Sequence, residues 1–354
     1  MNRRRFLQAL TLPLLAAGGL VGWRTSANPY YSGPVSDHFD GLRFFIEGVQ
    51  EKSRLDFLRW QTSGGRVKWP EAFPSPFTDK PPARVEGGAL RVSYVGHATL
   101  LIQTHGLNIL IDPVWSERAS PVQFAGPRRE NAPGVALADL PPLDYVLVSH
   151  NHYDHLDLVT LGVLANAHPK AQFLSPLGND AIMQDAVPLA RQRTCDWGAR
   201  VEIGPGAALH FEPCYHWSAR GVFDRRMALW SAFVIETPAG KIYHIADTGF
   251  GDGALFRQAR EKHGGFRLAI LPIGAYAPRW FMQGYHIDPD EAVKIMQLCG
   301  AEFALAHHWG TFQLTDEPID EPPRLLEAAL ARDAISPQRF QAKRPGETWE
   351  LPAV

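Results

Sequence analysis

The sequence predicts an α/β fold, and two observations support that prediction. Short apolar runs rich in β-branched residues, such as 145–148, alternate with segments whose leucines have helical spacing, such as 158–167. Histidine or aspartate residues directly follow several of the strand-like runs. Because polar residues at strand ends can converge from distant parts of the chain, the pattern favours a sheet sandwich with a site at one edge.

The composition is that of an ordinary globular protein. Of 354 residues, 45% are hydrophobic and 20% are charged, and the net charge is -2. This balance gives no basic patch, so we expect no nucleic-acid partner. The three cysteines, Cys195, Cys214 and Cys299, are too few and too scattered for a disulfide framework, and no two of them have metal-ligand spacing.

The first 27 residues are expected to be a targeting segment. The stretch Asn2-Arg3-Arg4-Arg5-Phe6-Leu7 resembles a twin-arginine export signal, and the apolar run 9–21 that follows is short and glycine-rich for a membrane span. Small residues at 25–27 offer a cleavage site. The sequence therefore predicts a periplasmic protein that is exported folded; the alternative is an uncleaved anchor that keeps it at the membrane.

Residues 28–88 are rich in proline and aromatic residues and are predicted to form an N-terminal arm. Within it, 43–60 is predicted to form one amphipathic helix, and the rest is expected to be extended. An arm packed on its own domain is favoured over a lipid-binding surface. The main domain is expected to span 89–354.

The elements of the main domain follow from local patterns. A turn at Pro238-Ala239-Gly240 joins two strand-like runs into a hairpin, and Asp288, Pro289 and Glu291 form a helix start with a cap, a first-turn proline and an acid three residues after the cap. Strands are predicted at 90–95, 99–104, 108–111, 145–148, 172–174, 209–214, 229–237, 241–246, 268–273 and, last, 302–306, and the run 201–210 is expected to lead into the strand 209–214. Helices are predicted at 158–167, 178–187, 254–262, 289–299 and 323–332, the final one closing the chain.

The densest polar stretch lies between the run 145–148 and the helix 158–167. It places three histidines and two aspartates in eight residues: His150, His152, Asp154, His155 and Asp157. In an extended segment His150 and His152 point to the same side and can chelate one ion, while Asp154 and His155 can supply a second. Imidazole and carboxylate ligands favour zinc or a similar ion. The alternative, a polar loop with scattered surface histidines, does not explain so dense a cluster.

Further candidate ligands each follow an apolar strand: His216, Asp247 and either His307 or His308. Two residues near the first strands, His97 and Asp112, are also candidates for the site. A carboxylate such as Asp112 can orient a ligand imidazole through its second nitrogen, although a turn-forming Asp-Pro is an equal alternative. The remaining histidines have no such context and are expected to be ordinary: His38, His105, His168, His210, His244 and His263.

These motifs together resemble the metallo-β-lactamase superfamily and, within it, N-acyl-phosphatidylethanolamine-hydrolysing phospholipase D. The cluster alone indicates only the superfamily, whereas the run 272–282 is more specific to the phospholipase branch. The arm matches poorly, and the export signal is not a feature of the family. The matching stretches run in order from residue 95 to 312: 95–99, 118–121, 149–157, 216–217, 246–249, 272–282 and 308–312.

The resemblance implies an αβ/βα sandwich, two mixed sheets flanked by helices, with two Zn²⁺ ions per chain. It implies that one ion is held by His150, His152 and His216, and the other by Asp154, His155 and His308, with Asp247 bridging both. It also implies that His286 assists turnover. Tyr285 replaces a glutamine of the family pattern and, with Tyr276 and Arg279, is a candidate for substrate contact; Arg279 is equally a candidate for a structural ion pair.

The implied function is a zinc-dependent phosphodiesterase that converts N-acyl-phosphatidylethanolamine-like phospholipids into phosphatidic acid and N-acylethanolamine. The alternatives are a lactonase or other ester hydrolase on the same fold, and a catalytically silent metal-binding protein. The expected partners are a phospholipid or another small-molecule ester, a membrane surface contacted peripherally, and a second copy of the chain in a homodimer.

Overall fold

The computed structural model describes residues 27–49 and 51–353. The predicted export signal therefore lies outside the described residues, except for Ala27. Within the described part of the chain, no helix is long and apolar enough to cross a membrane.

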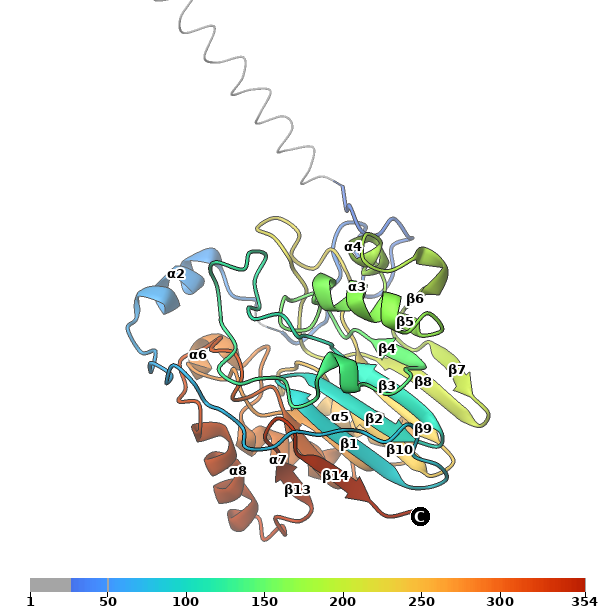
Figure 1. Ribbon diagram of the computed structural model, residues 1–354. Coiled ribbons are helices and arrows are strands. Elements are labelled where there is room, and N and C mark those ends of the chain that lie inside the picture. Colours follow the sequence, from blue (N-terminus) through green and yellow to red (C-terminus); the bar gives the residue numbers. More distant parts are fainter. Residues whose placement is uncertain (1–26, 50, 354) are drawn as a thin grey trace, which may run out of the picture.

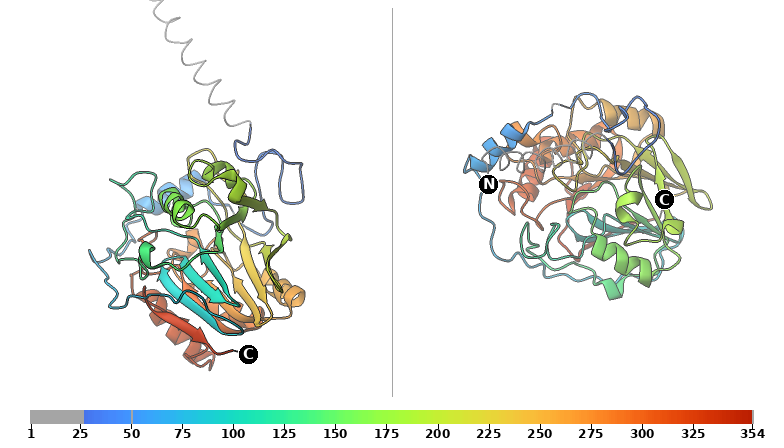
Figure 2. Two further views of the ribbon diagram at one scale, coloured as in Figure 1. Left: turned by 45° about the vertical axis from the view of Figure 1, so that its right-hand side comes forward. Right: turned by 90° about the horizontal axis from the view of Figure 1, so that it is seen from above.

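Two seven-stranded sheets stack face to face (Figures 1 and 2). The first sheet has the order β14-β1-β2-β3-β4-β5-β6, antiparallel from β14 to β3 and parallel from β3 to β6. Its strands are β1 (Leu90–Gly96), β2 (Thr99–Thr104), β3 (Leu107–Ile111), β4 (Tyr145–Leu147), β5 (Gln172–Pro176), β6 (Gln192–Cys195) and β14 (Thr348–Leu351).

The second sheet has the order β13-β12-β11-β10-β9-β8-β7 and is likewise mixed, antiparallel from β7 to β10 and parallel from β10 to β13. Its strands are β7 (Arg200–Gly204), β8 (Ala207–Glu212), β9 (Ala232–Thr237), β10 (Gly240–His244), β11 (Phe266–Pro272), β12 (Ala301–His307) and β13 (Phe340–Ala342).

Helices cover the outer faces of both sheets. On the first sheet lie α3 (Leu158–Ala167) and the short α4 (Asp180–Met183); on the second lie α5 (Ala254–His263), α7 (Pro289–Leu298) and α8 (Glu321–Arg332). The 3₁₀ turns η1 (Leu137–Asp139) and η2 (Leu189–Arg191) lie in connections of the first half. This arrangement confirms the predicted αβ/βα sandwich.

Side chains alternate between the two faces of a strand, so each sheet contributes both to the core between the sheets and to the core under its helices. In β2, Leu100 and Ile102 face the second sheet, while Leu101 between them packs under α3 with Leu161 and Leu164. Successive side chains of a strand point to opposite faces, so a strand covered on both sides must be apolar throughout. All six residues of β2 are buried, as this requires.

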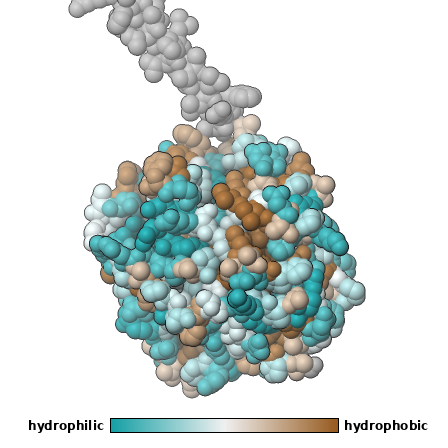
Figure 3. Space-filling view, in the orientation of Figure 1, coloured by the Kyte–Doolittle hydropathy of each residue, from teal (hydrophilic) through white to brown (hydrophobic). Residues whose placement is uncertain are grey.

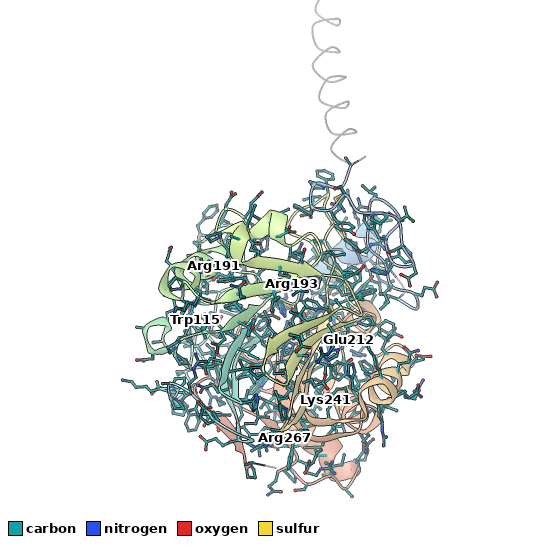
Figure 4. All side chains as sticks on the ribbon, turned by 90° about the vertical axis from the view of Figure 1, so that its right-hand side faces the viewer. Trp115, Arg191, Arg193, Glu212, Lys241 and Arg267 are labelled. Carbon is teal, nitrogen blue, oxygen red and sulfur yellow. The ribbon has the colours of Figure 1, made fainter. Side chains whose placement is uncertain are left out.

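Polar contacts fix α5 to the second sheet, on the side shown in Figure 4. Lys241 of β10 donates to the carbonyl of His263 (2.8 Å), and Glu212 of β8 contacts both His263 Nε2 (2.9 Å) and Lys262 Nζ (2.7 Å). The side chains of Glu212 and Lys241 are labelled there. This end of α5 is therefore fixed by charge as well as by apolar packing.

The arm packs on the domain, but its helix is shorter than predicted. Instead of 43–60, the helix α2 spans Arg54–Thr62, because Ser53 and Asp56 form a capping box that starts it there. The preceding segment folds back on itself, and Phe39 and Phe44 are buried in the core of the second sheet. The arm follows the domain further on, where Trp69 Nε1 donates to the carbonyl of Glu317 (2.7 Å).

Three other boundaries differ from the predictions. The helix expected at 178–187 is reduced to α4. The boundary between the runs 201–210 and 209–214 lies earlier than expected, at Gly206, whose φ of +70° permits the turn between β7 and β8. The strand 302–306 is not the last, and α8 does not close the chain: β13 and β14 follow it, and β14 pairs with β1. With β6, these strands have three or four residues each, too few for alternation to identify them.

Candidate metal centre

The seven predicted ligands lie together at one edge of the sandwich. The loop after β4 carries His150, His152, Asp154 and His155, and single ligands follow β8, β10 and β12. The cluster loop is held in place because Arg220 donates to the carbonyls of Asn151 (3.1 Å) and Leu156 (2.8 Å). The strand-end pattern of the sequence thus brings distant parts of the chain to one site.

One group of ligand atoms contains three imidazole nitrogens. His152 Nδ1 lies 2.9 Å from His150 Nε2 and 3.2 Å from His216 Nε2. Asp247 Oδ2 lies 3.9 Å and 3.7 Å from the same two Nε2 atoms. Two ligands bound tetrahedrally to zinc at about 2.0–2.1 Å lie roughly 3.3 Å apart, so the spacing of the nitrogens suits one shared ion.

A second group contains two carboxylates and two imidazoles. Asp154 Oδ2 lies 3.2 Å from His308 Nε2 and 3.4 Å from His155 Nε2. Asp247 Oδ2 lies 3.1 Å and 3.2 Å from those two nitrogens. These four atoms have the separations expected around a tetrahedral ion, and the same oxygen of Asp247 faces both groups.

Hydrogen bonds fix which nitrogen of three histidines faces the centre. His155 Nδ1 donates to Asp112 Oδ2 (2.8 Å), and His216 Nδ1 donates to the carbonyl of Tyr285 (3.1 Å). Ser149 Oγ donates to Asp112 Oδ2 (2.6 Å) and therefore accepts from His150 Nδ1 (2.9 Å). In each case Nε2 is left with its lone pair towards the centre, and Asp112 orients the ligands rather than merely forming a turn.

Unpartnered buried atoms fit a metal site. Among the described residues, His155 Nε2 and Asp247 Oδ1 are buried without a hydrogen-bond partner. Buried polar groups in folded proteins are normally paired. Metal ions bound between the seven ligand-type side chains would be the partners of these two atoms.

The pKa shifts of the site residues also fit a metal centre. Burial lowers the pKa of His152 to about 4, which keeps the imidazole in its neutral, metal-binding form. Burial opposes charge on His308, but the carboxylates of Asp247 and Asp154 outweigh it and raise the pKa to about 9. Burial likewise opposes charge on Asp247, yet His308 and His155 hold its pKa well below the usual range. The negative charge of the two buried carboxylates must therefore be balanced nearby, either by protons on the histidines or by bound metal ions.

The structure chooses between the two adjacent histidines. His308 lies in the centre, whereas His307 is fully buried beside His244, with ring centroids 5.0 Å apart. Neither ring nitrogen of His307 or His244 has a hydrogen-bond partner among the described residues. His97, the other candidate near the first strands, contacts the centre through its Nε2, which lies 2.8 Å from Asp154 Oδ2.

A cavity of about 640 Å³ opens onto the centre. His152, Asp154, Asp247 and His286 form part of its wall. His286 Nδ1 lies 3.9 Å from Asp247 Oδ2, and burial lowers the pKa of His286 to about 4. Tyr285 also lines the cavity, so both His286 and Tyr285 lie beside predicted metal ligands.

Two predicted substrate contacts require correction, because Tyr276 and Arg279 are not among the residues that line this cavity. Arg279 Nη2 pairs with Glu291 Oε2 (2.7 Å), and its Nη1 donates to the carbonyl of His286 (2.8 Å). The hydroxyl of Tyr276 donates to Glu321 Oε1 (2.7 Å). Arg279 therefore has the structural ion pair that the sequence left open.

Sequence reasoning missed most of the cavity wall. The described lining includes basic and aromatic residues from the arm and from the loop after His216, with Arg225, Trp217, Lys52, Arg54, Phe57 and Trp60 among them. The aromatic richness of the arm was the available signal. It did not show that α2 lies against the site, where Trp60 stacks on Phe281 at 5.0 Å.

A second cluster with ligand-type atoms is formed by His210, Glu212 and His263. Its carboxylate already contacts the Lys262 ammonium at 2.7 Å, and His210 Nε2 lies 2.8 Å from Glu236 Oε2. The cluster is therefore neutralised by protein groups, and these two histidines are structural, as expected from the sequence.

Comparisons with known proteins agree with this geometry. The model of the Beta-lactamase superfamily domain matches residues 107–309. The chain is 37% identical over 272 residues to N-acyl-phosphatidylethanolamine-hydrolyzing phospholipase D 1 of Caenorhabditis elegans, an alignment that covers 74% of this chain and 76% of the relative.

Two solved structures share the fold. Igni18, a metallo hydrolase from the archaeon Ignicoccus hospitalis, has a TM-score of 0.54 and 21% identity, covering 75% of this chain and 99% of its own. CmlA, a diiron β-hydroxylase from Streptomyces venezuelae, has a TM-score of 0.52 and 18% identity, covering 75% and 54%. With its metal-binding geometry, the chain belongs to the metallo-β-lactamase superfamily and is a metal-dependent hydrolase.

Proposed function

We propose that the protein is a zinc-dependent phosphodiesterase of the phospholipase D type. The observation that carries the proposal is the cavity above the metal centre, whose wall combines metal ligands, basic residues and a long apolar surface. N-acyl-phosphatidylethanolamine presents the same combination: a phosphodiester beside long acyl chains. The similarity to a relative named for this activity supports the choice.

The donor set favours zinc. Five imidazoles together with two carboxylates suit zinc, although one fold relative is a diiron enzyme. His150, His152 and His216 would hold one ion, Asp154, His155 and His308 the other, and Asp247 both. Bound zinc would lower the pKa of water to about 7 and neutralise charge on a phosphate.

Residues of the chain supply the rest of the chemistry. His286 Nδ1 lies 3.9 Å from Asp247 Oδ2, which places the imidazole where it could exchange a proton with a reacting group. Phe57, Trp60 and Phe281 give an apolar wall for an acyl chain.

A peripheral membrane contact fits the surroundings of the cavity mouth. The cavity wall includes Leu58 and Val222, whose side chains are largely exposed. Beside them Leu55 of α2 is 76% exposed, and Phe223 lies under the Arg54 guanidinium at 5.9 Å. Figure 3 shows apolar surface at the upper left, where α2 lies in Figure 1. A rim that is both apolar and basic suits an anionic bilayer, from which a lipid can enter.

The test is a hydrolysis panel with zinc-reconstituted protein whose metal content is measured. N-palmitoyl-phosphatidylethanolamine in mixed micelles should yield phosphatidic acid and N-palmitoylethanolamine, quantified by mass spectrometry. Asp247→Asn, which removes the bridging charge, is the control. Ready hydrolysis of a lactone with no cleavage of any phospholipid would favour the lactonase alternative and refute the proposal.

We also propose export to the periplasm, on the basis of Arg3 and Arg4 in the first seven residues. Changing both arginines to lysine should leave the protein in the cytoplasm. Fractionation that finds an unchanged periplasmic yield would count against this.

A further inference from the structure

Arg225 is a half-buried cation with no acidic partner. Among the described residues, none of the ion pairs within 4 Å involves it, and its Nε is buried without a hydrogen-bond partner. The neighbouring Arg226, in contrast, pairs with Glu51 at 2.8 Å. A half-buried guanidinium without a counter-charge keeps its positive charge free to attract an anion that enters beside it.

The guanidinium is held in a fixed position by neutral groups. It lies over the ring of Trp217 at 4.4 Å, its Nη2 donates to the hydroxyl of Tyr285 (3.0 Å), and its Nη1 donates to the carbonyl of Lys52 (3.3 Å). An arginine has five N–H donors, so these two contacts leave one N–H on Nη1 and one on Nη2 without an acceptor, besides the buried Nε–H. Its orientation is fixed while its charge is not neutralised.

This position adjoins the metal centre. Arg225 and Trp217 both line the cavity that contains Asp154 and Asp247. The Trp217 ring stands edge to face with the ring of the metal ligand His152, with centroids 4.5 Å apart. Only one aromatic ring therefore separates the guanidinium from the ligands.

We infer that Arg225 forms an anion subsite in the cavity beside the metal centre. This subsite binds a phosphate oxygen that is not bound to the metal ions. This rests on the proposed function. The planar guanidinium fork matches a phosphodiester, and such charge-assisted hydrogen bonds are strong and directional. A neutral ester leaves this half-buried cation unpaired, so the subsite makes the enzyme selective for anionic substrates over neutral ones.

The test compares two substrates that differ in charge and by a single methyl group. Bis(4-nitrophenyl) phosphate is a monoanion, and its methyl triester is neutral; both release 4-nitrophenol. In Arg225→Gln, kcat/KM for the diester should fall about 10- to 100-fold, the range expected for lost hydrogen bonds to a charged group, while kcat/KM for the triester stays within about threefold. Arg225→Lys should recover part of the loss, because it restores the charge without the fork.

Arg226→Gln is the matched control, since it removes an adjacent charge that already has a partner, and it should leave both rates within about threefold. Metal content and thermal unfolding should match the wild type in all three variants. Equal losses on diester and triester would assign Arg225 a purely structural role and overturn the inference, as would unchanged diester cleavage in Arg225→Gln.

A binding measurement separates this inference from the proposed function. Calorimetric titration of the zinc-loaded protein with dibutyl phosphate should show binding that weakens about tenfold or more in Arg225→Gln. If the wild type cleaves no phosphodiester but shows this Arg225-dependent binding, the function fails and the subsite stands. If it cleaves phospholipid while the variant binds dibutyl phosphate equally well, the function stands and the subsite fails.

Discussion

Asp112→Asn tests whether a residue that is not a ligand controls the metal centre. Asp112 is fully buried, and its carboxylate accepts three hydrogen bonds, from Ser149 N (2.7 Å), Ser149 Oγ (2.6 Å) and His155 Nδ1 (2.8 Å). Its φ is +43°, in the left-handed region that asparagine also tolerates. The substitution therefore changes hydrogen bonding and charge with little change in shape.

The magnitude follows from the hydrogen bonds. An amide has one oxygen, so if it keeps the bond to Ser149 N, its NH₂ group faces His155 Nδ1. The His155 proton must then move to Nε2, the atom that faces Asp154 and Asp247, and His155 can no longer bind a metal in its neutral form. Loss of such an orienting partner typically weakens metal affinity about 10- to 100-fold, or about 1.4–2.7 kcal/mol.

The assay is competition for zinc against a chromophoric chelator, with stoichiometry from elemental analysis. One of two bound ions should dissociate 10- to 100-fold more readily, because His155 belongs to one ligand group. Asp157→Asn is the matched control: the same change in the same loop, on a carboxylate that caps α3 by accepting from Val159 N (3.1 Å). Its other oxygen accepts from Trp115 N, Ser116 N and Thr160 Oγ1, and none of these groups is a predicted metal ligand, so zinc affinity should stay within about threefold even if stability falls. Unchanged affinity for both ions in Asp112→Asn would refute the reasoning.

Three further changes test the remaining roles. Asp247→Asn should weaken both ions together, because one of its oxygens faces both ligand groups; elemental analysis that finds only one ion lost would show that Asp247 does not bridge. His286→Ala should keep both ions and lower turnover about 10²- to 10⁴-fold, as expected for a group that moves a proton; loss of metal or of folding would make this histidine structural. Leu55→Asp should reduce sedimentation with anionic vesicles while leaving hydrolysis of a soluble diester unchanged, because Leu55 is not among the residues that line the cavity; equal vesicle binding would exclude α2 as the contact.

The ligands were predictable because they either lie close together in the sequence or follow a strand-like run. Four of them fall within the six residues 150–155, and His216 and Asp247 each follow a strand at the same edge of the sandwich. The choice between His307 and His308 was not available from the residues alone. It depends on the backbone: His307 is the last residue of β12, paired with Pro272, and the chain turns to a φ of +61° at His308.

The cavity was less predictable because its wall depends on tertiary contacts. The arm reads as apolar and extended, and nothing local shows that α2 packs on α6 (Arg279–Met282) through Trp60 and Phe281. Arg225 gives no sequence signal either, since an arginine followed by another arginine is typical of an exposed loop. What distinguishes it is an absent partner, and that is visible only when the surroundings are known.

Backbone strain shows how the fold prepares the site. Five of the non-glycine residues with positive φ lie at its edge: His97, Asp112, Ala246, Ala275 and His308 have φ between 43° and 61°. Each follows or ends a strand, at the point where the chain must turn sharply to direct a side chain or its neighbour at the centre. The left-handed conformation costs about 1–2 kcal/mol per residue, and the apolar packing between the sheets can offset it. These turns thus let strands from distant parts of the chain deliver the ligand side chains to one edge of the sandwich.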